Sequence, residues 1–363
     1  MDIVKLSKIE AICLVIVATI NQVILGAPKV ILLGNGSGSL LNIIAITFLA
    51  IILILLISFL FKRFQSSDII DVSAFLGGKI LKTVVSILYI GIFFVINAIC
   101  LRYISEFLKI IYFRDYSIIF ISLFFLVAMV FASQRGLKAI AKINVLTIVT
   151  SFITIFILLI GSSPSFVAER ALPVLGYGFD KTFFVNLSNI FAFSGILYLM
   201  LLMPYLENTK DFKQIGIISI VLSSVYLFIS VLCLLLVFPF ITIIKDIFSV
   251  FLLTRIVEYS PILERTDAIY VFFWLFCILS YLSANLFFIM NNFSKITNLK
   301  NPSGLSYCFT LLTLGITIFI TEVSQYFFVY TSFFPCYFII LIIISILILV
   351  FANIKDRKKN RKE

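Results

Sequence analysis

The chain has 363 residues, of which 62% are hydrophobic and 12% charged, and its formal net charge is +11. Its mean hydropathy of +1.21 excludes a soluble globular protein, because such a fold needs a charged surface that this composition cannot supply. A positive charge can indicate nucleic acid binding, but here the charged residues are confined to the connections and ends of long apolar runs. The sequence therefore predicts an integral membrane protein.

A membrane-spanning helix needs about 20 apolar residues, and ten segments come close to that length. We expect an all-α integral membrane protein of about ten transmembrane helices. Residues 1–353 are predicted to form a single permease-like transmembrane domain and residues 354–363 a basic cytoplasmic tail. The first segment lacks a short apolar core and a cleavage site, so we expect residue 1 to be the mature start. The ten segments are 10–33, 40–61, 81–101, 117–133, 142–161, 183–203, 214–238, 268–290, 305–321 and 335–353.

The positive charges predict the orientation in the membrane. If the N-terminus is cytoplasmic, 19 of the 28 Lys and Arg residues fall on the cytoplasmic side and 9 on the other. Cytoplasmic loops are enriched in Lys and Arg, so both termini are predicted to be cytoplasmic. The basic tail is a topology anchor in this interpretation, although binding of anionic lipid stays open.

No catalytic or metal chemistry is indicated. The chain has no histidine, and its six cysteines lie singly, without the spacing of metal ligands. The acidic residues fall in loops, tails or the terminal turns of spans, so no carboxylate is placed for a proton relay in midmembrane. Arg102 and Glu106 are predicted to pair at a span end. We expect a protein that is not an enzyme and has no cofactor.

The first apolar segment is interrupted inside the membrane. Its sequence runs through the amides Asn21 and Gln22 to Gly26, Ala27 and Pro28. Proline removes a backbone donor and blocks a further helical bond, and glycine relaxes the backbone. Backbone groups freed at this depth must face protein, water or a ligand. A simple proline kink explains the feature equally well.

The sixth segment has a second interruption, at Phe193, Ser194 and Gly195. Breaks in the first and sixth spans are five spans apart, which a five-plus-five inverted repeat would produce. Freed N–H groups at half-helix starts favour a carboxylate and freed carbonyls favour an ammonium. The pair of breaks therefore suits an amino acid zwitterion.

Spans three and eight carry polar stripes at helical spacing that can complete such a pocket. The alternative is that these aromatic and small polar residues only hold helices together. The stripe of span three comprises Tyr89, Phe93, Asn97 and Cys100, and that of span eight comprises Asp267, Tyr270, Trp274, Cys277, Tyr281 and Asn285.

The connection before span eight contains an amphipathic stretch at 246–260. Its apolar residues Phe248, Phe251, Leu252, Ile256 and Val257 alternate with charged ones. We expect it to lie flat at the outer membrane interface.

Several phrases together resemble the B subunits of GerA-type spore germinant receptors, the endospore germination permeases within the amino acid–polyamine–organocation superfamily. The resemblance covers nearly the whole chain. It rests on the Gly-Ala-Pro break and, in order, on SAFLGGKILKTVVSILYI at 73–90, LRYISEFLK at 101–109, RGLKAIAKIN at 135–144, LPVLGYG at 172–178 and VEYSPILERTDAIYVFFWLF at 257–276.

The resemblance implies a ten-span broken-helix transporter fold in the inner membrane of a bacterial spore. It also implies binding of a small nutrient, usually an amino acid, and assembly with a larger A subunit and a lipoprotein C subunit. The implied pocket comprises the breaks and the inward faces of spans three and eight. An acidic residue often follows the span-six glycine in this family, whereas this chain has Ile196, which argues against proton coupling.

These features predict a nutrient sensor that shifts between two packings of the bundle and signals through its partners. Two alternatives stay open. The first is an active amino acid transporter coupled to H⁺ or Na⁺, and the second is a scaffold for the partner subunits. The predicted substrate-binding residues are Asn21, Gln22, Gly26, Ala27, Pro28, Tyr89, Asn97, Phe193, Ser194, Gly195, Trp274, Cys277 and Tyr281.

Overall fold

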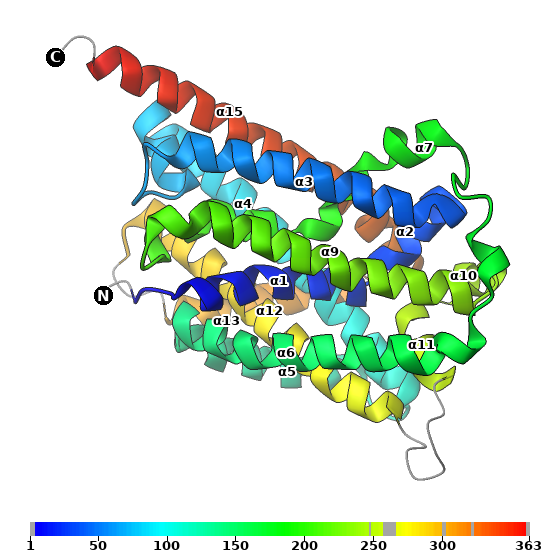
Figure 1. Cartoon of the computed structure of the whole chain (residues 1–363). Coiled ribbons are helices and arrows are strands. Elements are labelled where there is room, and N and C mark those ends of the chain that lie inside the picture. The colour runs from blue at the N-terminus through cyan, green and yellow to red at the C-terminus, as the bar shows by residue number, and fades with distance from the viewer. Residues whose placement is uncertain (1–3, 247, 257–265, 300–302, 321–322, 361–363) are drawn as a thin grey trace.

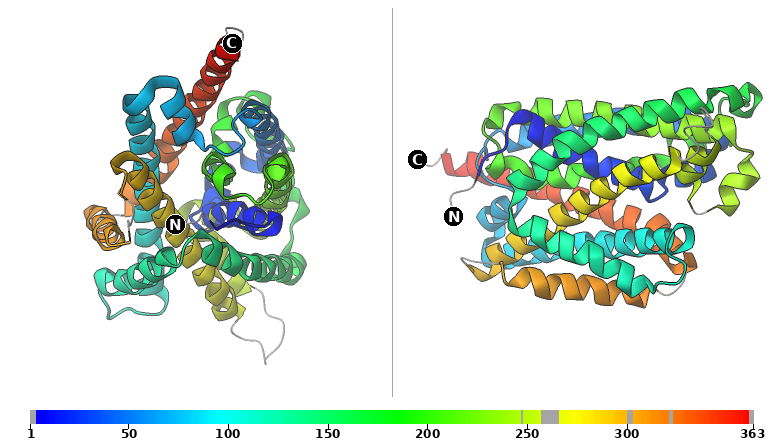
Figure 2. Two further views of the ribbon diagram at one scale, coloured as in Figure 1. Left: turned by 90° about the vertical axis from the view of Figure 1, so that its left-hand side faces the viewer. Right: turned by 90° about the horizontal axis from the view of Figure 1, so that it is seen from below.

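A computed structural model describes residues 4–246, 248–256, 266–299, 303–320 and 323–360. Within these ranges the secondary structure is helical, apart from turns, loops and an isolated bridge between Leu6 and Leu206. The helices run side by side in an elongated bundle (Figures 1 and 2). The all-α prediction is therefore confirmed.

Each predicted span lies on a helix or a pair of helices. The first is α1 (Lys8–Ile24) with α2 (Ala27–Asn35), and the sixth is η4 (Val185–Phe193) with α8 (Gly195–Leu202). The other eight, in chain order, are α3 (Ser39–Phe61), α4 (Ile69–Ile111), α5 (Ile118–Gln134), α6 (Leu137–Ser162), α9 (Phe212–Val237), α12 (Thr266–Thr297), α13 (Leu305–Phe319) and α15 (Phe334–Asn360).

The described residues hold six helical stretches that are long and apolar enough to cross a membrane, and a bent pair at the sixth predicted span can be a seventh. The helices α5 and α13 are apolar but shorter, at 17 and 15 residues. The chain is therefore a multi-pass membrane protein. The count of ten spans, the inverted repeat and the division at residue 353 stay predictions.

Short elements connect the long helices. They are η1 (Gly36–Gly38), η2 (Ser163–Ser165), η3 (Ala168–Ala171), α7 (Phe179–Phe183), η5 (Met203–Tyr205), η6 (Thr209–Asp211), α10 (Phe240–Lys245), α11 (Ser249–Ile256), α14 (Val323–Phe328) and the π turn η7 (Val329–Phe333).

The start of α1 and the end of α15 lie at the same end of the bundle (Figure 1). The basic segment after residue 353 continues α15 as a helix to Asn360, and residues 361–363 lie outside the described chain. That both termini lie on the cytoplasmic side of the membrane stays a prediction.

The helix that carries the third predicted span, 81–101, is longer than that span. The helix α4 starts at Ile69, because Asp68 caps it and forms a reciprocal capping box with Asp71. It is bent at Gly77 and Gly78, and Gly78 has a left-handed φ of 66°. The charged residues before 81 hid this start, since they resemble a loop by composition alone.

Helix α1 lies among the other helices (Figure 2, left), in contact with α6, α8, α9 and α12. Almost all of its residues from Glu10 to Ile24 are buried. Lipid gives no hydrophobic drive between such helices, so close backbone approach and interhelical hydrogen bonds hold them together. A helix enclosed by protein can tolerate the interruption at its end, because its freed groups meet other helices.

The amphipathic stretch does not lie with its apolar face in lipid. Helix α11 packs on α6, α9 and α12, and Phe248 and Phe251 are buried. Their rings lie 5.0 and 4.9 Å from that of Phe107. An interfacial helix usually turns its apolar face to lipid, whereas Phe248 and Phe251 pack on an aromatic surface of the protein. That the stretch lies flat at the outer membrane interface stays a prediction. Val257 and Glu258 lie outside the described residues.

Candidate binding site at the two broken helices

The first break lies between α1 and α2. Gly26 has a φ of 104°, a left-handed conformation, and Pro28 lies in the first turn of α2, where its missing N–H costs no helical bond. Two carbonyls at the break accept bonds from tyrosines outside α1. Tyr330 Oη donates to Gln22 O at 3.1 Å, and Tyr326 Oη donates to Leu25 O at 2.6 Å.

The second break lies at Ser194, between η4 and α8. The two helical pieces around it are bent by 56°. Gly195 starts α8 against the backbone of α1, and a Cβ there would lie 2.4 Å from Val15 O. Only glycine fits this approach, so the glycine that begins the second half-helix also brings it close to the first broken helix.

The two breaks meet at the Gln22 side chain. Gln22 Nε2 donates to Ser194 Oγ at 3.0 Å and lies 3.5 Å from Tyr281 Oη on α12. Tyr330 Oη also lies 3.1 Å from Gln22 Oε1, so its single proton is shared between the two Gln22 oxygens. Gln22, Ser194, Tyr281 and Tyr330 are all buried. One amide thus links four elements that are far apart in sequence.

Asn21 and Cys277 lie beside this junction. Asn21 Nδ2 donates to Val17 O at 2.8 Å and to Cys277 O at 3.1 Å, and Ser151 Oγ lies 3.0 Å from Cys277 Sγ. Asn21 Oδ1 is buried and has no hydrogen-bond partner within the described chain. A buried acceptor without a partner is costly, so this oxygen is available to a ligand donor.

Three polar side chains, linked by hydrogen bonds, join α4, α8 and α12 beside the junction. Tyr198 Oη donates to Asn285 Oδ1 at 2.6 Å, and Asn285 Nδ2 donates to Asn97 Oδ1 at 2.8 Å. The Tyr198 ring lies 6.2 Å from that of Tyr281. Asn97 is therefore connected to the junction of the breaks only indirectly, through Asn285 and Tyr198.

Two predicted residues lie elsewhere. Tyr89 bonds Ser345 on α15 at 2.9 Å. Trp274 is two helical turns from Tyr281, about 10 Å along α12, and its ring lies 5.2 Å from that of Phe107 beneath α11. These contacts do not bring either side chain to the junction. Phe193 is buried directly before Ser194. Gly26 is the N-cap of α2, and Ala27 and Pro28 are its first two residues.

Sequence reasoning missed Tyr198, Tyr326 and Tyr330. The two latter tyrosines belong to α14 and η7, a stretch that the sequence places between two spans. Their spacing of four residues puts both on one helical face, and their rings stack at 6.0 Å. That spacing was the available signal, but it did not reveal which helix the face covers.

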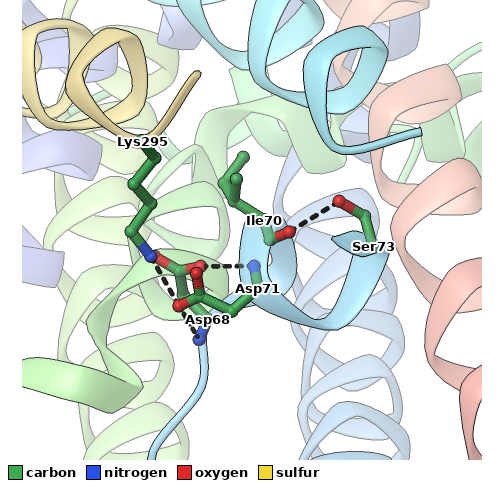
Figure 3. Close-up of polar contacts among 5 residues, drawn as sticks. All are labelled: Asp68, Ile70, Asp71, Ser73 and Lys295. Atoms are coloured by element: carbon green, nitrogen blue, oxygen red, sulfur yellow. Dashed lines mark hydrogen bonds and ion pairs between the residues drawn. The ribbon is translucent and has the colours of Figure 1, made fainter. Parts of the chain in front are cut away.

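A separate ion cluster lies where α4 begins and α12 ends. Lys295 Nζ contacts Asp68 Oδ2 and Asp71 Oδ2, each at 2.6 Å (Figure 3). Asp68 is fully buried, and this burial raises the pKa of its carboxyl to about 6 although Lys295 opposes the shift. The predicted Arg102–Glu106 pair is confirmed, at 2.8 Å.

Known proteins place this arrangement in context. Residues 5–328 match the sequence profile described as spore germination protein. No curated protein sequence matches the chain. Among solved structures, a manganese transporter of Eremococcus coleocola, in complex with an aromatic bis-isothiourea substituted compound, is similar with a TM-score of 0.56 and 15% identity, over 95% of this chain and 76% of that one.

At 15% identity the transporter likeness concerns the fold alone. The profile match covers most of the chain and agrees with the resemblance found in the sequence. A multi-pass helical bundle, two broken helices in contact and this match lead to one assignment: the chain belongs to the spore germination protein family.

Proposed function

We propose that this chain is the nutrient-binding subunit of a germinant receptor and that it binds a neutral amino acid where the two broken helices meet. The observation that carries the proposal is the bond between Gln22 and Ser194, which joins the two breaks directly. Family membership and the transporter-like fold support a receptor or transporter role.

The groups around the junction suit a zwitterion. Asn21 Oδ1 is a buried acceptor without a partner in the described chain, and the carbonyls of Gln22 and Leu25 each have a second lone pair beyond the tyrosine bond. These three oxygens can accept from an ammonium. The backbone N–H groups at the start of α8 can receive the carboxylate.

The side chain of the ligand would meet neutral groups. Ser194, Tyr281 and Tyr198 offer hydroxyls, and Phe191 and Phe193 offer apolar surface, all of them buried. A charged ligand side chain placed here would lose its hydration without gaining a counter-charge. A neutral amino acid is therefore favoured over an acidic or basic one.

Binding would open the Gln22–Ser194 contact, because the ligand has to lie between the end of α1 and the start of α8, where these two side chains now meet. The ligand then stabilises a packing in which α1 and α8 lie differently, and its preference for that packing shifts the equilibrium. We propose that A and C subunits in the spore inner membrane respond to this shift. We also propose that both termini face the spore core, as the Lys and Arg distribution indicates.

A coupled amino acid transporter is the second candidate, because the family is permease-like and the solved relative is a transporter. Ile196, where the family often has an acid, is buried in α8 and cannot carry a proton. This residue favours sensing over proton-coupled transport. Uptake of radiolabelled amino acid into proteoliposomes under an ion gradient distinguishes the two functions, since only a transporter accumulates it.

A thermal-shift screen of the twenty common amino acids on purified protein tests binding. A ligand that binds only the folded state must raise its stability. We expect at least one neutral amino acid to raise the Tm of the wild type and of the control variant Ser230→Ala. Ser230 is a buried serine on α9 whose hydroxyl donates to Tyr226 O of the same helix. The shift should be lost in Ser194→Ala. If none of the twenty shifts the Tm of the wild type, the amino acid proposal is wrong.

A further inference from the structure

A groove separates the ends of α3 and α15. It has a cavity volume of about 530 Å³ and lies apart from the broken helices. Its walls carry the apolar side chains Phe59, Val350 and Ile354, and its rim carries Lys62, Arg63 and Arg357. Apolar and cationic side chains therefore share one opening.

The groove lies at the level where both helices leave the apolar layer. The uncharged run of α3 ends at Phe61, and the first charge after it is Lys62. The uncharged run of α15 extends to Ile354. Asn353 Nδ2 donates to Leu60 O at 2.9 Å, which holds the two helix ends at the same height. Acyl chains and headgroups meet at this height.

The rim has more positive than negative charge. Arg63 pairs with Asp356 at 2.9 Å. Lys355 is directed elsewhere, because its Nζ donates to the carbonyls of Phe75 and Leu76. Lys62 and Arg357 are exposed and have no ion-pair partner in the described part of the chain. Two cations at the rim are therefore not neutralised by protein.

The walls are open to lipid. Phe59 is 67% exposed and Ile354 is 44% exposed, and at this height their exposed surface faces acyl chains. Basic pockets between transmembrane helices at a membrane boundary are suited to the headgroups of anionic lipids, since cations hold the phosphate while apolar walls hold the chains.

We propose that this groove binds an anionic glycerophospholipid, whose phosphate lies between Lys62 and Arg357 and whose acyl chain lies along Phe59 and Ile354. A free phosphate would share the charge contacts but leave the apolar walls unused. The lipid therefore binds more tightly than its soluble headgroup, and an uncharged or zwitterionic lipid binds more weakly.

The test uses purified full-length protein in detergent and measures lipid retention by native mass spectrometry. Phosphatidylglycerol, phosphatidylcholine and glycerol phosphate are the three probes. Each basic residue near the headgroups contributes roughly fivefold, so Lys62→Gln/Arg357→Gln should lower the apparent affinity for phosphatidylglycerol about 30-fold. This variant leaves the Arg63–Asp356 pair intact.

Lys79→Gln/Lys82→Gln is the control, because it removes the same charge from α4, whose lysines do not line the groove. It should retain phosphatidylglycerol as the wild type does. Asp356→Asn should strengthen retention, since it releases Arg63 from its partner. Three results would each overturn the proposal. The first is an equal loss of phosphatidylglycerol affinity in the test and control variants. The others are that the wild type retains phosphatidylcholine, or binds glycerol phosphate, as tightly as phosphatidylglycerol.

Discussion

Replacing Gly195 by alanine tests how closely the two broken helices must approach. The added Cβ would lie 2.4 Å from Val15 O and 2.8 Å from Val15 Cγ1. Ordinary contact begins at 3.4 Å, so α8 must move away from α1 by about 1 Å. Overpacking of this kind costs about 1–3 kcal/mol, and the gain in helix propensity from glycine to alanine, at most about 1 kcal/mol, offsets only part of that cost.

Gly315→Ala is the matched control. Gly315 lies within α13, and a Cβ there meets nothing within 4 Å, so alanine should be neutral or stabilising by up to about 1 kcal/mol. We expect a lower Tm for Gly195→Ala in detergent and a weaker germination response, because the shift separates Ser194 from Gln22. A Tm for Gly195→Ala equal to that of Gly315→Ala would refute the close approach.

Three further substitutions test particular contacts. Tyr330→Phe removes the donor to Gln22 O and Oε1 and should lower stability in detergent unfolding by about 1–2 kcal/mol; an unchanged unfolding curve contradicts that role. Lys295→Met leaves the Asp68 and Asp71 carboxylates without their cation and should cost about 2–3 kcal/mol, less than a fully buried pair because Lys295 is 21% exposed. Burial raises the pKa of Asp68 from 3.8 to about 6, so the folded state binds this proton more tightly than the unfolded state, and the wild type should gain stability as pH falls from 7 to 5. Asp68→Asn keeps an N-cap residue and should lack about 1 kcal/mol of that gain; equal pH slopes for the two proteins would contradict the shifted pKa.

The positions of both breaks could be predicted because the apolar runs are long and their interruptions are conspicuous. Gly26, Pro28 and Ser194 interrupt otherwise apolar sequence, and a backbone so interrupted in lipid must satisfy its polar groups elsewhere. The polar stripe of span eight likewise indicated that Tyr281 and Cys277 share a face. The local sequence was therefore enough to predict where the helices break and which residues of span eight share a face.

Which side chains meet at each break depends on how the helices are shifted along one another, and the spacing of residues within one helix does not reveal this. Gln22 was recognised as polar, but its bond to Ser194 requires the end of α1 to lie beside the start of α8. Tyr330 comes from a short π turn after α14, whose composition resembles a connection. Trp274 was predicted from the same stripe as Tyr281, yet two helical turns separate them.

Equilibrium binding of an amino acid that stabilises the wild type tests the central claim most directly, measured on purified wild type, Gln22→Ala, Ser194→Ala and Ser230→Ala. If the junction of the two broken helices is the binding site, each of the first two substitutions should raise the Kd about tenfold or more, the effect of losing about 1.4 kcal/mol. Ser230→Ala should leave the Kd unchanged. Wild-type Kd values for both Gln22→Ala and Ser194→Ala would contradict the account.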